Sequence, residues 1–186
     1  TLFFVVHAIA MTLISIPKEV EVKGKTIELS DIAQIDSDNS DLMDRVKKVN
    51  LGMSPSPGEK KVIETKYIVL RMQKEGIDPE DFDFSCSDRV VVSRESQIIT
   101  KEKLNAVVNE LIGKYLGVKK DRIVFDSLTG LEDVVVPDGD VDYKLDVRRN
   151  IEKYGRFIGN LDISINGEVI KKLWIQAKMS FNMNVG

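Results

Sequence analysis

The chain has 186 residues, of which 42% are hydrophobic and 31% charged, a balance that is typical of a folded protein and excludes a disordered one. The formal net charge of −3 and the lack of a basic block remove the electrostatic attraction on which nucleic-acid binding depends. The single cysteine, Cys86, and the single histidine, His7, exclude an intramolecular disulfide, a cysteine-based zinc site, an HExxH site and a Ser–His–Asp triad. We therefore expect no catalytic residue, no cofactor and no metal, and a protein that is not an enzyme.

Two acidic loops do not change this expectation. An EF-hand loop that begins at Asp36 places Asp41 where glycine is needed, and one that begins at Asp138 places Tyr143 there. Both stretches are therefore predicted to be solvated loops.

The N-terminus has the features of an export signal. Leu2–Ile9 is almost wholly apolar, and Ala8-Ile9-Ala10 has the Ala-x-Ala form of a signal-peptidase site. The run is too short to span a bilayer as a helix, which takes about 20 residues. We predict that residues 1–16 are the remnant of an export signal, and that the protein works outside the cytoplasm with no stable membrane insertion after signal removal. The alternative is a buried first strand.

The centre of the N-terminal half is a rigid corner over Leu51–Ile63 (LGMSPSPGEKKVI). Its prolines and glycines predict a turn with few backbone hydrogen bonds, between two short strands. A helical pattern then begins at Thr65 and stops at Gly76. An earlier short strand is followed by Ser30 as the expected N-cap of a helix. Residues 17–99 are therefore predicted to form a small strand-and-helix module.

The clearest helix in the sequence begins at Thr100. Apolar residues recur at helical spacing and form one broad stripe, made of Leu104, Val107, Val108, Leu111, Ile112, Tyr115 and Leu116. Thr100 is expected to cap this helix and Gly117 to end it. A helix that binds a groove or a membrane surface usually has a polar face rich in Lys and Arg, which this one lacks. We therefore expect it to pack on a sheet.

The sequence after this helix is almost entirely of strand type. Strands are expected over residues 121–128, 134–136, 143–149 and 157–165. Asn166-Gly167 predicts a type I′ hairpin turn, and alternation then continues unusually far, from Val169 to Val185. Residues 100–186 are predicted to form a curved antiparallel sheet packed by one long amphipathic helix, and the whole chain to be α+β. The final strand is expected to be an exposed edge.

The order of these features resembles one family. The stretches that carry the resemblance are IELSDIAQI (Ile27–Ile35), LGMSPSPGEKKVI (Leu51–Ile63), TKYIVLRMQKEGI (Thr65–Ile77) and RVVVSRESQIITKEKL (Arg89–Leu104). As an ordered set they are similar to the N-terminal part of flagellar basal-body P-ring formation proteins, the FlgA family. The match covers Val20–Leu104, and Leu104–Val185 fits more loosely.

The resemblance implies a periplasmic chaperone that helps P-ring subunits assemble around the flagellar rod, without catalysis and without a cofactor. The partner is then the P-ring subunit. Family members continue into a C-terminal SAF-type β-clip domain and a small β-barrel, and the chain is expected to stop about where that segment begins.

A chaperone for a sheet-rich subunit can bind by strand addition at an exposed edge or through an apolar patch. The polar face of the final strand has the only tryptophan, and Trp is enriched in binding hot spots. We select Trp174, Ile170, Lys172 and Gln176 as candidate partner-binding residues; a Trp that only covers one side of the sheet is the alternative. The alternative function is an exported envelope-structural or carbohydrate-binding module, against which the low aromatic content of 6% weighs.

Overall fold

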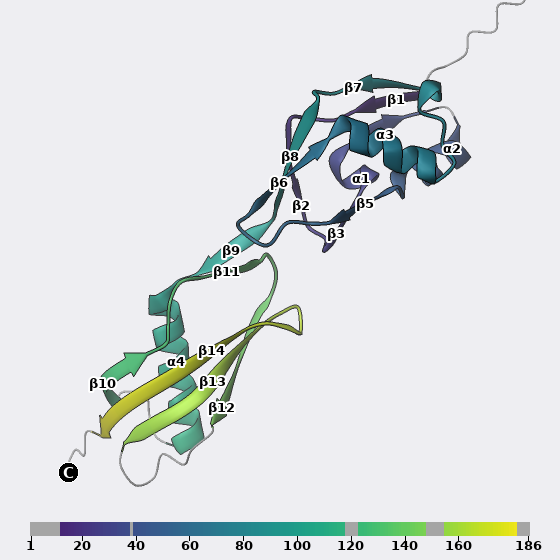
Figure 1. Cartoon of the computed structure of the whole chain (residues 1–186). Coiled ribbons are helices and arrows are strands. Elements are labelled where there is room, and N and C mark those ends of the chain that lie inside the picture. Colours follow the sequence, from purple (N-terminus) through teal and green to yellow (C-terminus); the bar gives the residue numbers. More distant parts are fainter. Residues whose placement is uncertain (1–11, 38, 118–122, 148–154, 182–186) are drawn as a thin grey trace, which may run out of the picture. The chain divides into compact units, whose positions relative to one another are not determined.

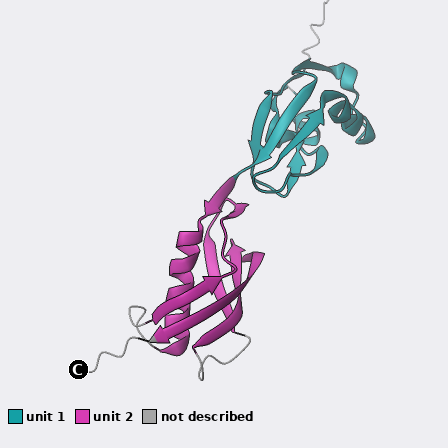
Figure 2. Ribbon diagram, turned by 60° about the vertical axis from the view of Figure 1, so that its left-hand side comes forward, with its two compact units in different colours: residues 1–95 teal, residues 96–186 magenta. Residues whose placement is uncertain are grey.

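The computed structural model describes residues 12–37, 39–117, 123–147 and 155–181, and the chain divides into two compact units, 1–95 and 96–186 (Figures 1 and 2). Each unit has helices and strands around its own cluster of buried apolar side chains. The predicted α+β class is confirmed.

The division lies between Glu95 and Ser96, whereas the sequence predicted it between residues 99 and 100. Strand β9 (Ser96–Ile99) explains the difference, because it pairs antiparallel with β11 (Val134–Pro137) in the second unit. Ile99 is buried in the core of that unit. Strand β9 belongs to unit 2 because its pairing partner β11 does, and β11 is too distant in the sequence for this pairing to be predicted locally.

The first strand, β1 (Thr12–Ser15), overlaps the predicted export remnant of residues 1–16. It pairs antiparallel with β4 (Gln34–Asp36) and parallel with β7 (Phe82–Ser85), and Ile14 is fully buried. This strand is part of the core of unit 1, to which Ile14 and Ile16 contribute buried side chains. Leu2–Ala10, with His7, lies outside the described residues, and the export signal there stays a prediction.

The remaining described elements of unit 1 are strands and short helices. Its other strands are β2 (Glu19–Val22), β3 (Thr26–Glu28), β5 (Asn50–Met53), β6 (Lys60–Glu64) and β8 (Arg89–Arg94). Its helical segments are α1 (Leu29–Ile32), α2 (Ser40–Lys47), α3 (Thr65–Lys74) and the short 3-10 helix η1 (Pro79–Asp81). Strand β1 lies between β4 and β7, β8 lies between β2 and β6, and β3 pairs with β5.

The predicted corner joins β5, β6 and α3. Gly52 and Gly58 have φ angles of 102° and 81°, which residues with a Cβ rarely adopt. Lys61 Nζ donates to the carbonyl of Met53 at 2.8 Å and so links the two sides of the corner. Leu51 is fully buried at its entry, which anchors the turn to the core of unit 1.

The first helix begins earlier than predicted. Its N-cap is Glu28 rather than Ser30, and the Glu28 amide donates to Asp31 Oδ2 at 2.7 Å. Leu29, the first helical residue, is fully buried, and its amide donates to the carbonyl of Val49 at 2.9 Å. The helix therefore begins at the residue whose side chain is buried, Leu29, and not after Ser30, although serine is a common N-cap residue.

In unit 2 the long helix α4 (Lys101–Leu116) has the predicted ends. The Lys103 amide donates to Thr100 Oγ1 at 3.3 Å, so Thr100 is the N-cap. Gly117 follows the helix with a φ of 67°, the left-handed conformation that ends many helices.

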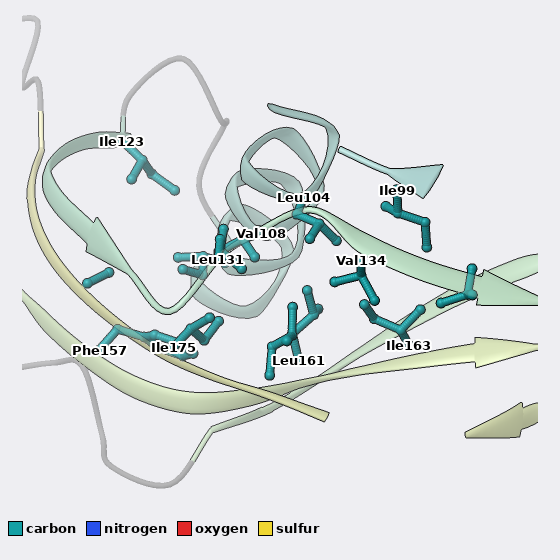
Figure 3. Close-up of a cluster of buried hydrophobic side chains, with 14 of the residues drawn as sticks. Ile99, Leu104, Val108, Ile123, Leu131, Val134, Phe157, Leu161, Ile163 and Ile175 are labelled. Carbon is teal, nitrogen blue, oxygen red and sulfur yellow. The ribbon is translucent and has the colours of Figure 1, made fainter. Parts of the chain in front are cut away.

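Within the described residues, an antiparallel four-stranded sheet has the order β10 (Ile123–Thr129), β14 (Glu168–Phe181), β13 (Arg156–Ile165) and β12 (Val141–Val147). Helix α4 packs on one face of this sheet. Its buried residues Leu104 and Val108 share one apolar cluster with Phe157, Leu161 and Ile175 of the sheet (Figure 3). The predicted packing of the amphipathic helix on a sheet is confirmed.

The final strand, β14, is not an edge, which corrects that expectation. It pairs with β13 along one side and with β10 along the other, and the two edges of the sheet are β10 and β12. The predicted hairpin between β13 and β14 is present, because Asn166 and Gly167 have φ angles of 50° and 82°.

Candidate functional site

The candidate site is the sheet face of unit 2 that points away from α4, which we call the outer sheet face. Alternation creates it: Leu173, Ile175 and Ala177 of β14 are buried in the core, and the residues between them are exposed. This face includes Ser127 and Thr129 of β10, Arg156, Ile158, Asn160 and Asp162 of β13, and Lys172, Trp174, Gln176 and Lys178 of β14.

The centre of the outer sheet face is Trp174, whose side chain is 45% exposed. Its register partner on β13 is Asn160, and Gln176 follows on the same face of β14. A half-exposed indole beside two amide side chains combines apolar contact area with hydrogen-bond donors and acceptors. Such a surface is suited to binding an extended polypeptide or a sugar ring.

One end of this face is held by an ion pair. Lys172 Nζ lies 3.1 Å from Asp162 Oδ2 across the two strands. The Lys172 side chain is 64% exposed and that of Asp162 only 14%, so the pair joins an exposed cation to a largely buried carboxylate. Its main effect is to orient both side chains beside Trp174.

Of the four residues selected from the sequence, the structure brings Lys172, Trp174 and Gln176 together and separates Ile170 from them. The β13–β14 register shifts between Ile163 and Ser164, which leaves Ile170 as an extra residue without a partner on β13. Ile170 is half-buried and packs against the core of unit 2.

The other half of the outer sheet face was not predicted from the sequence. Two rows of register partners cross three strands there, Ser127–Lys178–Arg156 and Thr129–Gln176–Ile158. They line a hollow of about 390 Å³ together with Phe157 and Ala177, whose side chains belong to the core. Alternation along β13 predicts that Arg156 and Ile158 share a face, but no local signal shows that β10 lies beside β14.

Unit 1 has a larger open hollow, of about 920 Å³, that includes Cys86. The half-buried thiol lies 3.6 Å from Thr65 Oγ1, and that hydroxyl also donates to the carbonyl of Ser87 at 2.7 Å. Nearby, a 2.7 Å contact with Lys66 holds the pKa of the Glu64 carboxyl below its usual range. None of these groups forms an arrangement with a recognisable chemistry.

Metal-ligand clusters and membrane-spanning helices are both absent from the described part of the chain. No group of three or more His, Cys, Asp or Glu side chains in that part is close enough to hold a metal ion. None of its helices has the length and apolar character needed to cross a bilayer.

Comparison with known proteins finds distant neighbours among solved structures, including the two that follow. No protein-family model and no curated protein matches the sequence. A protein of unknown function from Eubacterium ventriosum is similar over 45% of this chain and 91% of its own length, with 18% identity and a TM-score of 0.37. The flagellar protein FlgA from Thermotoga maritima is similar over 90% of this chain, with 14% identity and a TM-score of 0.29. The chain spans about half of that FlgA structure, 52% of its length. Both TM-scores are below 0.5, so neither likeness indicates a function for this chain.

Proposed function

We propose that this protein is a periplasmic, non-catalytic chaperone that helps P-ring subunits assemble around the flagellar rod. The proposal rests on the ordered set of sequence stretches that resemble the FlgA family, not on the distant structural neighbours. One structural observation supports it: all four stretches contribute to one core.

That core is the buried cluster of unit 1. Each stretch supplies at least one fully buried side chain to it, namely Leu29, Leu51, Ile68 and Val90 in chain order. The first three stretches and Arg89–Glu95 of the fourth are therefore parts of one packed unit, and Ser96–Leu104 belongs to unit 2. A likeness that extends over a whole core is more informative than a single short motif, because packing constrains all of its members together.

We further propose that the chaperone contacts its partner through the outer sheet face around Trp174. Assembly intermediates of sheet-rich subunits expose apolar surface, and a half-exposed tryptophan between polar side chains can cover such surface and still be tolerated in water. Tryptophan is also among the residues that most often dominate binding energy at interfaces.

The test uses purified P-ring subunit, with its aggregation followed by light scattering in the presence of the chain. We expect the chain to slow aggregation and to cross-link to the subunit, and Trp174→Ala to weaken both effects. Tyr115→Ala is the matched control, because Tyr115 is 52% exposed on α4 of the same unit. The proposal fails if the unmodified chain neither slows aggregation nor forms a cross-link. If the Trp174→Ala variant slows aggregation and cross-links as well as the unmodified chain does, the contact surface lies elsewhere and the chaperone function still stands.

The second candidate is an exported carbohydrate-binding or envelope-structural module. The observation that favours it is the same exposed indole beside the Asn160 and Gln176 amides, which can stack on a sugar and hydrogen-bond its hydroxyls. Saturable quenching of Trp174 fluorescence by a soluble cell-wall oligosaccharide, without any effect on P-ring subunit aggregation, would favour this module over the chaperone.

A further inference from the structure

Two basic side chains lie directly opposite each other at one end of the outer sheet face. Arg156 of β13 and Lys178 of β14 are register partners, and both are exposed. Side chains at such positions have Cβ atoms about 4.5–5.5 Å apart, and like charges there repel. Within the described residues, neither of them forms an ion pair with a carboxylate.

The other residues that line the hollow beside this pair are uncharged, either polar or apolar. Arg156 and Lys178 line the hollow of about 390 Å³, and none of its lining residues is acidic. Ser127 is the partner of Lys178 on β10, and the hydroxyl of Thr129 lies in the next row. Asp126, also on β10, does not line the hollow, and it accepts a hydrogen bond from Ser180 Oγ at 3.2 Å.

We propose that this hollow is a binding site for a phosphate-type oxyanion, either free or as the terminal phosphoryl group of a larger molecule. A phosphate monoester has a charge of about −1.5 to −2 at pH 7, which matches the two cations. The guanidinium group of Arg156 suits two oxygens of one phosphate, and Lys178 supplies a point charge. Bound anion also removes the repulsion between the two side chains. This site goes beyond the chaperone function and does not depend on it.

Trp174, the only tryptophan in the chain, lies outside the hollow but on the same face of β14 as Gln176, which lines it, so its fluorescence serves as one readout of binding. The chain is titrated with inorganic phosphate, and separately with glycerol 3-phosphate, at an ionic strength held constant with NaCl. We expect a saturable change with a dissociation constant in the millimolar range, because the site is exposed to solvent. Equal responses assign recognition to the phosphoryl group, and a response to inorganic phosphate alone assigns it to the free ion.

The variant pair makes the test specific. Arg156→Gln combined with Lys178→Gln is expected to raise the dissociation constant about tenfold or more. Lys101→Gln and Lys103→Gln together remove the same charge from exposed positions on α4 of the same unit, outside the hollow, and are expected to leave the constant unchanged.

Melting temperature gives an independent readout. At low salt without phosphate, the Arg156→Gln, Lys178→Gln variant is expected to melt at or above the temperature of the unmodified chain, because the repulsion is gone. Phosphate then raises the melting temperature of the unmodified chain and not that of the variant. The site is refuted if phosphate acts no differently from NaCl of equal ionic strength, or if the variant binds phosphate as well as the unmodified chain.

Discussion

Replacing Ile112 by alanine tests whether α4 and the four-stranded sheet share one core. Ile112 is fully buried in the apolar cluster of unit 2. The change removes three buried carbon groups worth about 0.8 kcal/mol each, and the cavity brings the total for such changes to about 2–5 kcal/mol. The better helix propensity of alanine returns a few tenths of a kcal/mol. We therefore expect the free energy of unfolding of unit 2 to fall by about 3 kcal/mol.

The assay combines urea unfolding with hydrogen exchange resolved by segment. Tyr115→Ala, the exposed control on the same helix, is expected to cost less than about 1 kcal/mol. In the Ile112→Ala variant, amide protection falls in β13 and β14 and is kept in β8, because Val90 and Val92 of β8 belong to the separate cluster of unit 1. Equal costs for the two variants, or an equal loss of protection in β8, would show that α4 and the four-stranded sheet do not share a core of their own.

Three smaller predictions follow from local contacts. Asn166→Ala is expected to cost about 1–2 kcal/mol in urea unfolding, and Asn166→Gly less, because φ at this position is 50° and Asn166 Oδ1 accepts from the Asp140 amide at 3.0 Å; the reverse ranking would contradict this. Tyr143→Phe is expected to raise the free energy of unfolding by about 1 kcal/mol, because the buried hydroxyl has no hydrogen-bond partner within the described residues. Lys66→Gln is expected to raise the pKa of Glu64 in an NMR titration, because the hydrogen bond and charge of Lys66 lower it. A lowered folded-state pKa stabilises the fold above the unfolded-state pKa, and this contribution is lost as the pH falls through the folded-state value. The Lys66→Gln variant should therefore lose less stability in acid, and an unchanged pKa would show that the contact does not persist in solution.

The features of unit 2 that the sequence predicted are those that local rules determine. The caps of α4 depend on Thr100 and Gly117 alone, and the β13–β14 hairpin on Asn166 and Gly167. Alternation along β14 separated the core face from the polar face correctly, so Trp174 was found on the exposed side.

The features that the sequence did not predict depend on partners distant in the chain. From the sequence alone β14 is expected to be an edge strand, because nothing local indicates that β10 pairs with it. Likewise, the pairing of β9 with β11 places the unit boundary before β9 and not after it. The bulge that turns Ile170 toward the core is likewise a property of the pair of strands, because strict alternation assigns this residue to the outer sheet face. The phosphate-type site has the same origin, since neither Arg156 nor Lys178 is informative until register brings them together.

The most direct test of the chaperone account is site-specific photo-cross-linking to purified P-ring subunit. A photoreactive residue is placed either at Gln176, in the centre of the outer sheet face, or at Glu102, which is exposed in the first turn of α4. The proposed function predicts a cross-linked product with the subunit from position 176 and little or none from position 102. No product from either position, or equal products from both, would contradict the claim that the outer sheet face receives the P-ring subunit.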